Sequence, residues 1–203
     1  VERAWGINLS YAGIDTTVKD DIDSDGTTNT TKDITNDVGI ASIFFEISNS
    51  FGERGHIALG VDYVPFSAEW EDRSTTQTSM KTDSTETSGT NKGSVEVDGH
   101  TTIYIQPGIT MANDVILYGT LAYVTADAEA DVQSVSSTDK TVDLSMDGTK
   151  YGVGIKKSTG FGFVKLEYAS TEYDTLSTTT SNNTKVTADM DVDFVTLSIG
   201  KSF

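Results

Sequence analysis

The side chains of this sequence that could bind a metal ion are gathered in one Asp-rich segment near the N-terminus. The segment reads Asp21-Ile-Asp-Ser-Asp-Gly26, so carboxylates stand at positions one, three and five and a glycine at position six. Calcium-binding loops begin with this spacing, because alternate oxygens reach the ion and glycine allows the sharp turn. The expected calcium ligands are Asp21, Asp23, Asp25, Thr27, Asn29 and Asp33. Position twelve is Lys32 where such loops carry a glutamate, so a solvated acidic loop stays open as the alternative.

The sequence has few of the residues that catalytic sites use, in particular histidine and cysteine. The two histidines, His56 and His100, are too few for a multi-histidine metal site. Strict alternation along a strand would put His100 and Asp98 on one face, but no serine or second base stands at a spacing that completes a hydrolytic triad. Cysteine is absent, which excludes thiolate zinc sites, cysteine nucleophiles and disulfides. We therefore expect a protein that is not an enzyme and has no catalytic residues.

The overall charge and length narrow the class of protein further. The 203 residues fit one domain, and 31 acidic against 14 basic residues give a formal net charge of −17. Such a charge argues against binding to the phosphate backbone of nucleic acid. No apolar run is long enough for a membrane-spanning helix, and residues 1–5 do not form a signal peptide. The chain is therefore expected to be cytosolic, or to be a mature chain whose signal peptide has been removed.

Alternation with period two runs through the chain and predicts β-strands with two unlike faces. In the first segment, Trp5, Ile7, Leu9 and Tyr11 share one face, and small or polar residues share the other. Seven further segments behave in the same way, which makes eight strands in all. The predicted strands are centred on residues 5–11, 41–48, 56–63, 102–106, 115–123, 151–156, 163–168 and 195–203.

The connections and the face chemistry together predict a transmembrane barrel. Short turns are expected at about 49–55, 108–114 and 157–160, and long loops at about 15–36, 71–93, 133–141 and 174–186. The face opposite the apolar one carries mainly Gly, Ala, Ser and Thr, which suits the crowded lumen of an eight-stranded barrel. The apolar face then points outward into lipid, and barrel closure pairs the backbone groups as a bilayer requires. We expect residues 1–203 to form one antiparallel up-and-down β-barrel.

The polarity of the two faces inverts beyond the apolar stripes. After Leu121 and Tyr123 the outward positions become Asp127 and Glu129, while the inward positions turn to valine and alanine. Similar inversions around residues 64–70, 142–147 and 189–194 predict strands that continue past the membrane into water. The strand at 95–106 keeps one parity throughout, and a β-bulge near Gly99 would restore the pattern.

Charged side chains on the inward face predict a polar network in the lumen. Its expected members are Glu46, Asp62, Lys156, Lys165 and Glu167. Buried charges need partners, so we predict ion pairs between neighbouring strands that close the lumen. A narrow ion path is the alternative. Above this network the inward face is apolar, and it is expected to form either packed core or a pocket for a hydrophobic ligand.

The C-terminal segment carries a family resemblance. Val195-Thr-Leu-Ser-Ile-Gly-Lys-Ser-Phe203 resembles the terminal assembly signal of bacterial outer-membrane β-barrels, with an aromatic last residue and alternating apolar residues before it. The matching residues are Val195, Leu197, Ile199, Gly200 and Phe203, while Lys201 departs from the pattern. The whole chain resembles the small eight-stranded class, including the opacity-like proteins, the Ail/OmpX type and the OmpA transmembrane domain. The resemblance implies the outer membrane as location, with the signal peptide removed, and recognition by the barrel-assembly machinery.

These observations set the functional expectation. We expect an outer-membrane structural or surface-interaction protein with acidic, Thr- and Ser-rich external loops, serving envelope integrity, adhesion or lateral assembly. The alternative is a narrow porin-like channel or an OmpW-like conduit for small hydrophobic ligands. The expected partners are outer-membrane lipid, lipopolysaccharide and neighbouring barrels, including copies of the same chain. Nucleic acid is not expected as a partner, and calcium is the one possible cofactor.

Overall fold

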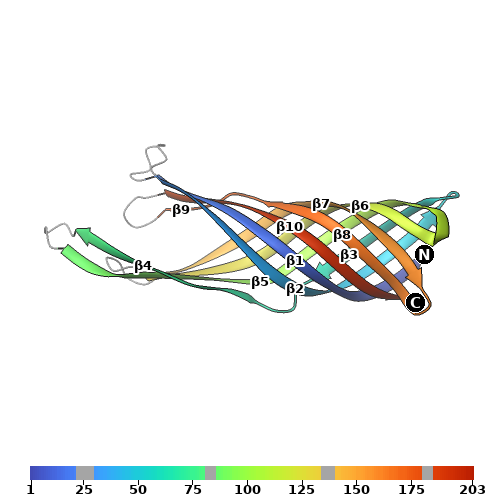
Figure 1. Ribbon diagram of the computed structural model, residues 1–203, viewed down its shortest axis with the longest axis horizontal. Helices are drawn as coiled ribbons and strands as arrows, with labels where there is room; N and C mark the ends of the chain where they lie inside the picture. The colour runs from blue at the N-terminus through green and yellow to red at the C-terminus, as the bar shows by residue number, and fades with distance from the viewer. Residues whose placement is uncertain (22–29, 81–85, 134–139, 180–184) are drawn as a thin grey trace.

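The computed structural model describes residues 1–21, 30–80, 86–133, 140–179 and 185–203, which are almost entirely antiparallel β-strand (Figure 1). The strands are β1 (Glu2–Asp21), β2 (Thr30–Phe51), β3 (Gly55–Tyr63), β4 (Ala68–Met80), β5 (Glu86–Thr110), β6 (Val115–Gln133), β7 (Lys140–Thr159), β8 (Gly162–Tyr173), β9 (Leu176–Thr179) and β10 (Lys185–Ser202). A short 3₁₀ turn, η2 (Ala112–Asp114), joins β5 to β6. No helix in the described part of the chain is long and apolar enough to cross a membrane.

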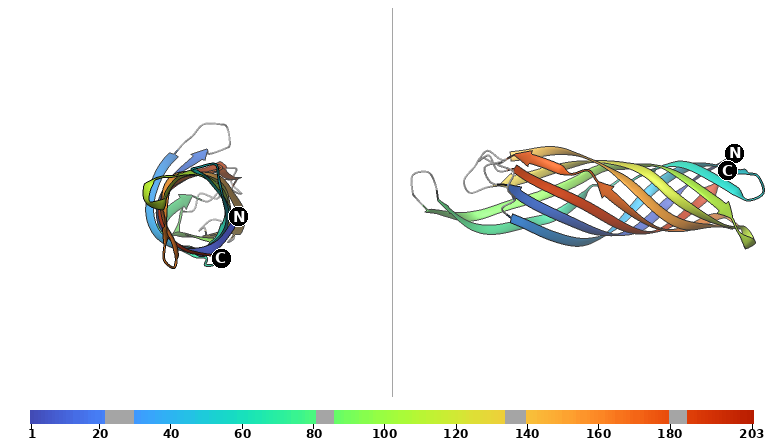
Figure 2. Two further views of the ribbon diagram at one scale, coloured as in Figure 1. Left: turned by 90° about the vertical axis from the view of Figure 1, so that its right-hand side faces the viewer. Right: turned by 90° about the horizontal axis from the view of Figure 1, so that it is seen from above.

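The strands close into a barrel. Eight of them form a hydrogen-bonded ring in the order β1-β2-β3-β5-β6-β7-β8-β10, and β10 pairs again with β1. The closing pair is long, running from Ala4 opposite Ser202 to Asp21 opposite Lys185. Seen end-on, the strands form a closed ring (Figure 2). Closure leaves these eight strands without a free edge in the half of the barrel near the termini, as the sequence predicts.

The two ends of the barrel differ. The N- and C-termini lie at the end with the short turns, and the long hairpins extend from the opposite end (Figure 1). The strands run further into the four expected loop ranges than alternation of apolar residues alone indicates. β1 continues to Asp21 and β2 starts at Thr30, so the described residues of the range 15–36 are all in strands. The reason is that threonine-rich, inverted alternation still favours strand, and β1 pairs with β2 as far as Asp20 opposite Thr30.

Two of the eight strands of the barrel wall are interrupted along their length. β3 ends at Tyr63 and β4 begins at Ala68, with Pro65, which has no N–H for a ladder, between them. In the same way β8 ends at Tyr173 and β9 begins at Leu176. β9 resumes pairing with β10, but β4 pairs with β5 alone among the described strands.

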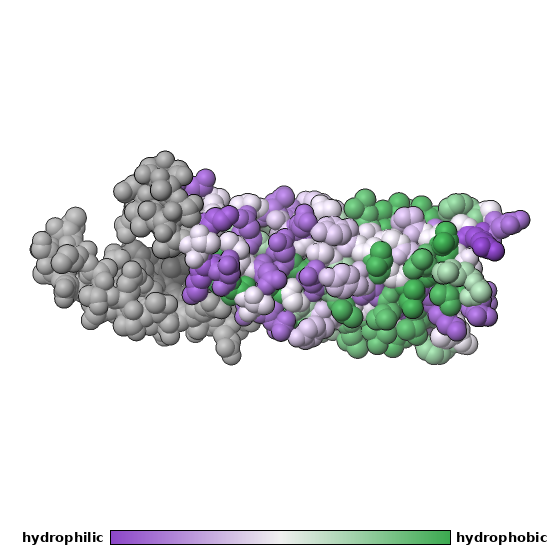
Figure 3. All heavy atoms as spheres, turned by 45° about the horizontal axis from the view of Figure 1, so that its top comes forward, coloured by the Kyte–Doolittle hydropathy of each residue, from purple (hydrophilic) through white to green (hydrophobic). Residues whose placement is uncertain are grey.

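An apolar belt covers the outside of the half of the barrel that holds the termini, and Figure 3 shows one face of it. The belt consists of exposed, outward-facing residues that include Trp5, Ile7, Leu9, Tyr11, Ile43, Phe45, Tyr63, Ile103, Leu121, Tyr123, Val153, Ile155, Leu166, Tyr168, Leu197 and Ile199. Inside the same half, small and polar side chains are buried, among them Asn8, Ser42, Thr102 and Thr196. The predicted assignment of faces is therefore confirmed.

Beyond the belt the inward face of the wall becomes apolar and the outward face becomes polar. Ile14, Val124, Ala126, Met146 and Val192 are buried inside the wall. β5 reaches this arrangement through a bulge, because its pairing with β6 shifts between Asp98 and Thr101 and Gly99 has a φ of 64°. Two residues of β5, Gly99 and His100, thus stand opposite one residue of β6. The bulge predicted near Gly99 is confirmed.

Candidate functional site

Glu46 is the centre of a charged network that fills the lumen at the level of the apolar belt. Its carboxylate is 1% exposed and accepts hydrogen bonds from Lys156 Nζ at 3.0 Å and from Lys165 Nζ. The Tyr104 hydroxyl donates a third bond at 3.2 Å. A buried carboxylate is tolerated only when its lone pairs and charge are matched, and this group meets that condition.

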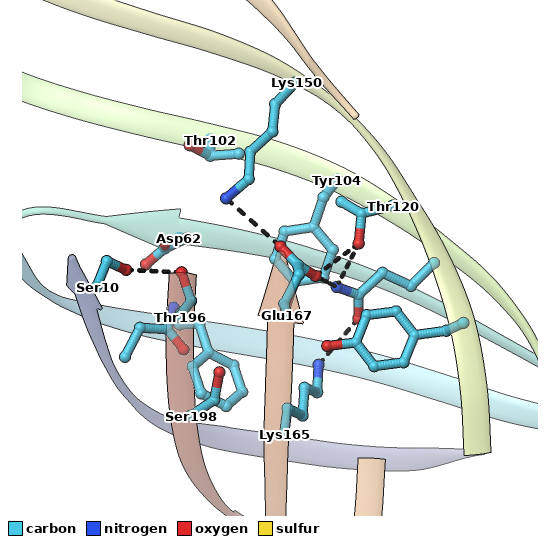
Figure 4. Close-up of a pocket in the computed structure, with 14 residues that line it drawn as sticks. Ser10, Asp62, Thr102, Tyr104, Thr120, Lys150, Lys165, Glu167, Thr196 and Ser198 are labelled. Atoms are coloured by element: carbon cyan, nitrogen blue, oxygen red, sulfur yellow. Dashed lines mark hydrogen bonds and ion pairs between the residues drawn. The ribbon is translucent and has the colours of Figure 1, made fainter. Parts of the chain in front are cut away.

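Glu167 forms a second centre beside the first. Its Oε2 accepts hydrogen bonds from Thr120 Oγ1 at 2.7 Å and Gln106 Nε2 at 3.0 Å, and its Oε1 lies 3.5 Å from Lys150 Nζ. Gln106 joins the two centres, because its Oε1 also accepts a bond of 2.9 Å from Lys165. The close-up in Figure 4 shows Lys150, Thr120 and Lys165 converging on this region from different strands. The network therefore ties several strands together across the lumen.

Aromatic rings occupy the space that the polar groups leave. Tyr104 lies over Gly60 and Tyr118 over Gly154, where an added Cβ would come within 2.3 Å and 2.5 Å of the tyrosine ring or hydroxyl. Nearer the termini, Lys156 Nζ lies 4.0 Å from the centroid of the Phe163 ring, a cation–π contact. Glycine at the facing positions lets the rings lie flat against the wall. Side chains thus fill the bore, as an eight-stranded barrel permits. We call the charged network and these rings the plug.

A small polar cavity remains at the edge of the plug. It measures about 40 Å³, enough for about three water molecules, and lies among Ser10, Asp62, Lys150 and Glu167 (Figure 4). Six ionisable groups surround the cavity or belong to the plug. They are the acids Glu46, Asp62 and Glu167 and the lysines Lys150, Lys156 and Lys165. Their formal charges cancel when all six are ionised.

Comparison with solved structures addresses the fold. The outer membrane protease OmpT from Escherichia coli superposes with a TM-score of 0.51 at 10% identity, covering 100% of this chain and 97% of that one. This chain has the fold of the outer-membrane β-barrels. Two other solved barrels align over most of their length, the attachment invasion locus protein Ail of Yersinia pestis (TM-score 0.41, 15% identity, 97% and 99% covered) and Neisserial surface protein A (0.30, 8%, 93% and 96%). No family model and no curated protein matches the sequence.

Within this outer-membrane barrel fold, four of the five predicted lumen charges meet in the plug. Asp62 does not pair with Glu46 or with a lysine, and its buried Oδ1 has no hydrogen-bond partner beside the small cavity. The prediction missed Gln106, Thr120, Tyr104 and Lys150. The first three stand on the inward parity of their strands, so the alternation already points to them, whereas Lys150 lies one residue before the predicted strand at 151–156.

The hypothetical pairing of His100 with Asp98 is wrong, because the bulge separates them. Asp98 is exposed on the outer face and accepts a bond from Gly99 N at 2.6 Å. His100 is largely buried, and its Nε2 lies 3.0 Å from the Tyr173 hydroxyl. Burial, together with the positive charge of Lys150, lowers the pKa of His100 to about 4, and burial raises the pKa of Tyr173.

The neutral state of His100 gives a testable pH dependence. The unfolded chain binds a proton at His100 below about pH 6.5, whereas the folded barrel binds it only near pH 4. Between these values the unfolded state carries more protons, so stability falls as the pH is lowered from about 6.5 to 4. We expect a loss of up to about 3 kcal/mol from this residue, measured as the difference in urea-unfolding free energy between wild type and His100→Gln across that range. A constant difference would contradict the assignment.

The predicted calcium ligands lie mostly outside the described residues, which end at Asp21 and resume at Thr30. Asp33 is described. It stands opposite Thr17 and accepts a bond of 2.8 Å from Thr17 Oγ1. Along β1, Thr17 is four residues from Asp21, or about 13 Å at the rise of a strand, so Asp33 does not share a coordination shell with Asp21 in this pairing. Calcium binding by Asp21, Asp23, Asp25, Thr27 and Asn29 stays a prediction.

The outer wall beyond the belt carries rows of acidic residues that lie side by side. Asp98 stands opposite Asp127, and Glu96 opposite Glu129, which in turn stands opposite Asp143. Like charges at opposed positions weaken a sheet slightly, so these rows favour full hydration of the wall. Among the described residues no group of three or more His, Asp or Glu is arranged to hold a metal ion.

The residues of the C-terminal segment up to Ser202 lie in the last strand, as the alternation predicts. Val195, Leu197 and Ile199 face outward within the belt, and Gly200 faces inward. A Cβ at Gly200 would come within 2.3 Å of the Phe163 ring. Phe203 is exposed, and its N–H donates to Arg3 O at 2.9 Å. A role of these residues in assembly stays a prediction.

Proposed function

We propose that the protein is a bacterial outer-membrane barrel that is closed to permeation and serves as a structural and surface-interaction protein. The observation that carries the proposal is the coincidence of the apolar belt outside with the plug inside, at the same level of the barrel. An outward apolar surface of this extent suits lipid and is unfavourable in water. The ion-paired, hydrogen-bonded plug at that level supports a lumen that is closed to permeation.

The part of the wall beyond the belt supports the surface role. There the strands continue for about ten residues, from Tyr11 to Asp21 in β1, and carry Thr, Asp and Glu outward. A hydrated acidic wall resists non-specific association and extends the described strands away from the lipid. In this proposal the protein contacts lipopolysaccharide and neighbouring barrels, and the barrel-assembly machinery inserts it. A non-catalytic role agrees with the separation of His100 from Asp98 across the wall.

Conductance in planar lipid bilayers tests the closed lumen. We expect the refolded wild-type barrel to give no steady openings. The double variant Tyr104→Ala, Tyr118→Ala removes the two rings that lie over Gly60 and Gly154, so it is expected to conduct and to show that inserted protein is being measured. Steady openings of the wild type would overturn the closed-lumen proposal in favour of a narrow channel. Fractionation of cells tests the location separately, and recovery outside the outer-membrane fraction would contradict it.

A further inference from the structure

A second cavity lies inside the barrel directly beyond the plug, and it is apolar. It measures about 320 Å³ and is lined by residues such as Ile14, Val38, Met146, Met190 and Phe194. The inverted alternation described above explains why these side chains point inward at this level. The cavity ends at the plug, because Phe194 lines it and Lys150 Nζ, which borders the small polar cavity, lies 5.0 Å from the centroid of the Phe194 ring.

The cavity borders on a stretch of barrel wall that lacks strand pairing. β2 pairs with β3 from Ile43 to Phe51, and among the described residues its part before Ile43 is paired only with β1. The strand expected next to this edge of β2 is β3, but β3 ends at Tyr63 and residues 64–67 form no strand. β4, which follows, pairs with β5 and not with β2. Exposed residues from both sides of the gap line the cavity: Gly39, Ala41, Phe66 and Ser67. We call this stretch of unpaired wall, where exposed residues line the cavity, the side mouth.

The mouth lies at the edge of the apolar belt. The last paired residues below it are Ile43 and Tyr63, both of which belong to the belt. Phe66, which is 67% exposed, lies at the mouth itself. A molecule dissolved in the outer part of a bilayer would thus reach the cavity without passing through the lumen or crossing the hydrated wall.

One pair of polar groups faces this apolar space. His100 Nε2 and the Tyr173 hydroxyl are 3.0 Å apart, and both residues line the cavity. With one bond made between them, the tyrosine oxygen retains capacity to accept a bond or, in the other tautomer of His100, to donate one. Because the lowered pKa keeps His100 neutral at pH 7, the pair offers no positive charge to an anion. The pair therefore suits an uncharged hydroxyl or carbonyl group.

We propose that this cavity is a binding site for a small, uncharged, lipid-soluble molecule that carries one hydroxyl or carbonyl group and enters from the membrane through the side mouth. An apolar protein cavity of roughly 150 Å³ holds benzene, so the present volume suits a ligand of about a dozen non-hydrogen atoms. The apolar lining supplies affinity, and the His100–Tyr173 pair orients the single polar group. The proposal goes beyond the closed barrel proposed above, because the plug stops the ligand from passing on through the lumen.

Methionine methyl groups make the proposal directly testable. Met146 and Met190 line the cavity, whereas Met111 lies beside η2 at the end with the short turns and is 52% exposed. The barrel is refolded into lipid nanodiscs with carbon-13-labelled methionine methyls and titrated with 1-naphthol, which has the required size and one hydroxyl group. We expect saturable shifts of the Met146 and Met190 signals and none of comparable size at Met111. 1-Naphthalenesulfonate, an anion with the same ring, is expected to leave the signals of Met111, Met146 and Met190 in place.

Two pairs of variants separate orientation from occupancy. Tyr173→Phe removes the hydroxyl and is expected to weaken 1-naphthol binding by a factor of roughly two to ten while leaving naphthalene binding unchanged. Its control, Tyr151→Phe, removes an exposed hydroxyl that donates to Glu172 on the outer wall. Val38→Phe fills the cavity and is expected to abolish the shifts at Met190. Its control, Val153→Phe, makes the same change on the belt.

Three results would overturn the proposal. The first is an absence of shifts at Met146 and Met190 at saturating 1-naphthol in the wild type. The second is a set of shifts at Met111, Met146 and Met190 that rise together without saturation, which would show partition into lipid only. The third is equal binding of the sulfonate, which would show that the site does not select an uncharged ligand. None of these results depends on whether the lumen conducts, so they leave the proposed function to its own experiment.

Discussion

Replacing Glu46 with alanine is expected to lower the free energy of unfolding by about 3–5 kcal/mol. The variant leaves Lys156 and Lys165, both almost fully buried, without the carboxylate that they share. The cost is therefore mainly the desolvation of unpaired charge and not the loss of three hydrogen bonds. Urea titration of the barrel refolded in detergent micelles, followed by tryptophan fluorescence, measures the change.

Two further variants make the Glu46 experiment decisive. Glu172→Ala removes an exposed carboxylate that accepts a bond of 2.7 Å from Tyr151, and is expected to cost less than about 1 kcal/mol. The triple variant Glu46→Leu, Lys156→Met, Lys165→Met removes the charges together and is expected to recover most of the lost stability, because buried ion pairs can be replaced by apolar groups of similar volume. A small effect of Glu46→Ala, comparable with that of Glu172→Ala, would show that water reaches the plug freely.

Placing an arginine at Leu166 is expected to destabilise the membrane-inserted barrel by about 2–4 kcal/mol. Leu166 is 49% exposed, faces outward, and stands between Ile155 on β7 and Leu197 on β10, which places it within the apolar belt. A guanidinium there must stay in the hydrocarbon or reach the interface by distorting the bilayer. Reversible unfolding from phospholipid vesicles gives the free energy directly.

The matched control for Leu166 lies on the same strand. Ser170 follows four residues later, beyond Tyr168, and is therefore above the belt. Ser170→Arg is expected to change the unfolding free energy by no more than about 1 kcal/mol. Equal costs at the two positions would contradict the depth assigned to the belt. In detergent-free water, by contrast, neither variant is expected to fold.

The general architecture could be predicted from the sequence because side chains alternate regularly between the two faces of a barrel wall. Successive residues point to opposite faces, so residues such as Leu9 and Asn8 reveal which face meets lipid without knowledge of any long-range contact. The same rule located the bulge, since Val97 and Ile103 share a parity that an unbroken strand could not satisfy. Strand ends were harder to place, because Thr-rich segments pair well across a hairpin without apolar residues to mark them.

The contacts inside the lumen could not be predicted in the same way. Alternation says that Glu46 and Lys165 point inward, but not that they meet across a distance of 119 residues in the chain. That depends on the stagger of the strands around the ring, which no single strand encodes. The predicted proximity of Glu46 and Asp62 followed from neighbouring strands, yet Glu46 found its partners on β7 and β8. The side mouth was equally hidden, since Pro65 was its only local signal.

The bulge at Gly99 and His100 has a consequence for how this gene can change. On β1, β6 and β10 the exchange of faces depends only on which amino acids stand at the inward and outward positions. Substitutions can therefore alter it one position at a time. On β5 the exchange of faces depends on the number of residues in the strand. The one extra residue of the bulge turns every side chain that precedes it to the opposite face. Deleting a single codon there would turn Val97 toward water and Asp98 toward the apolar cavity. This strand is therefore expected to tolerate many substitutions and almost no change in length.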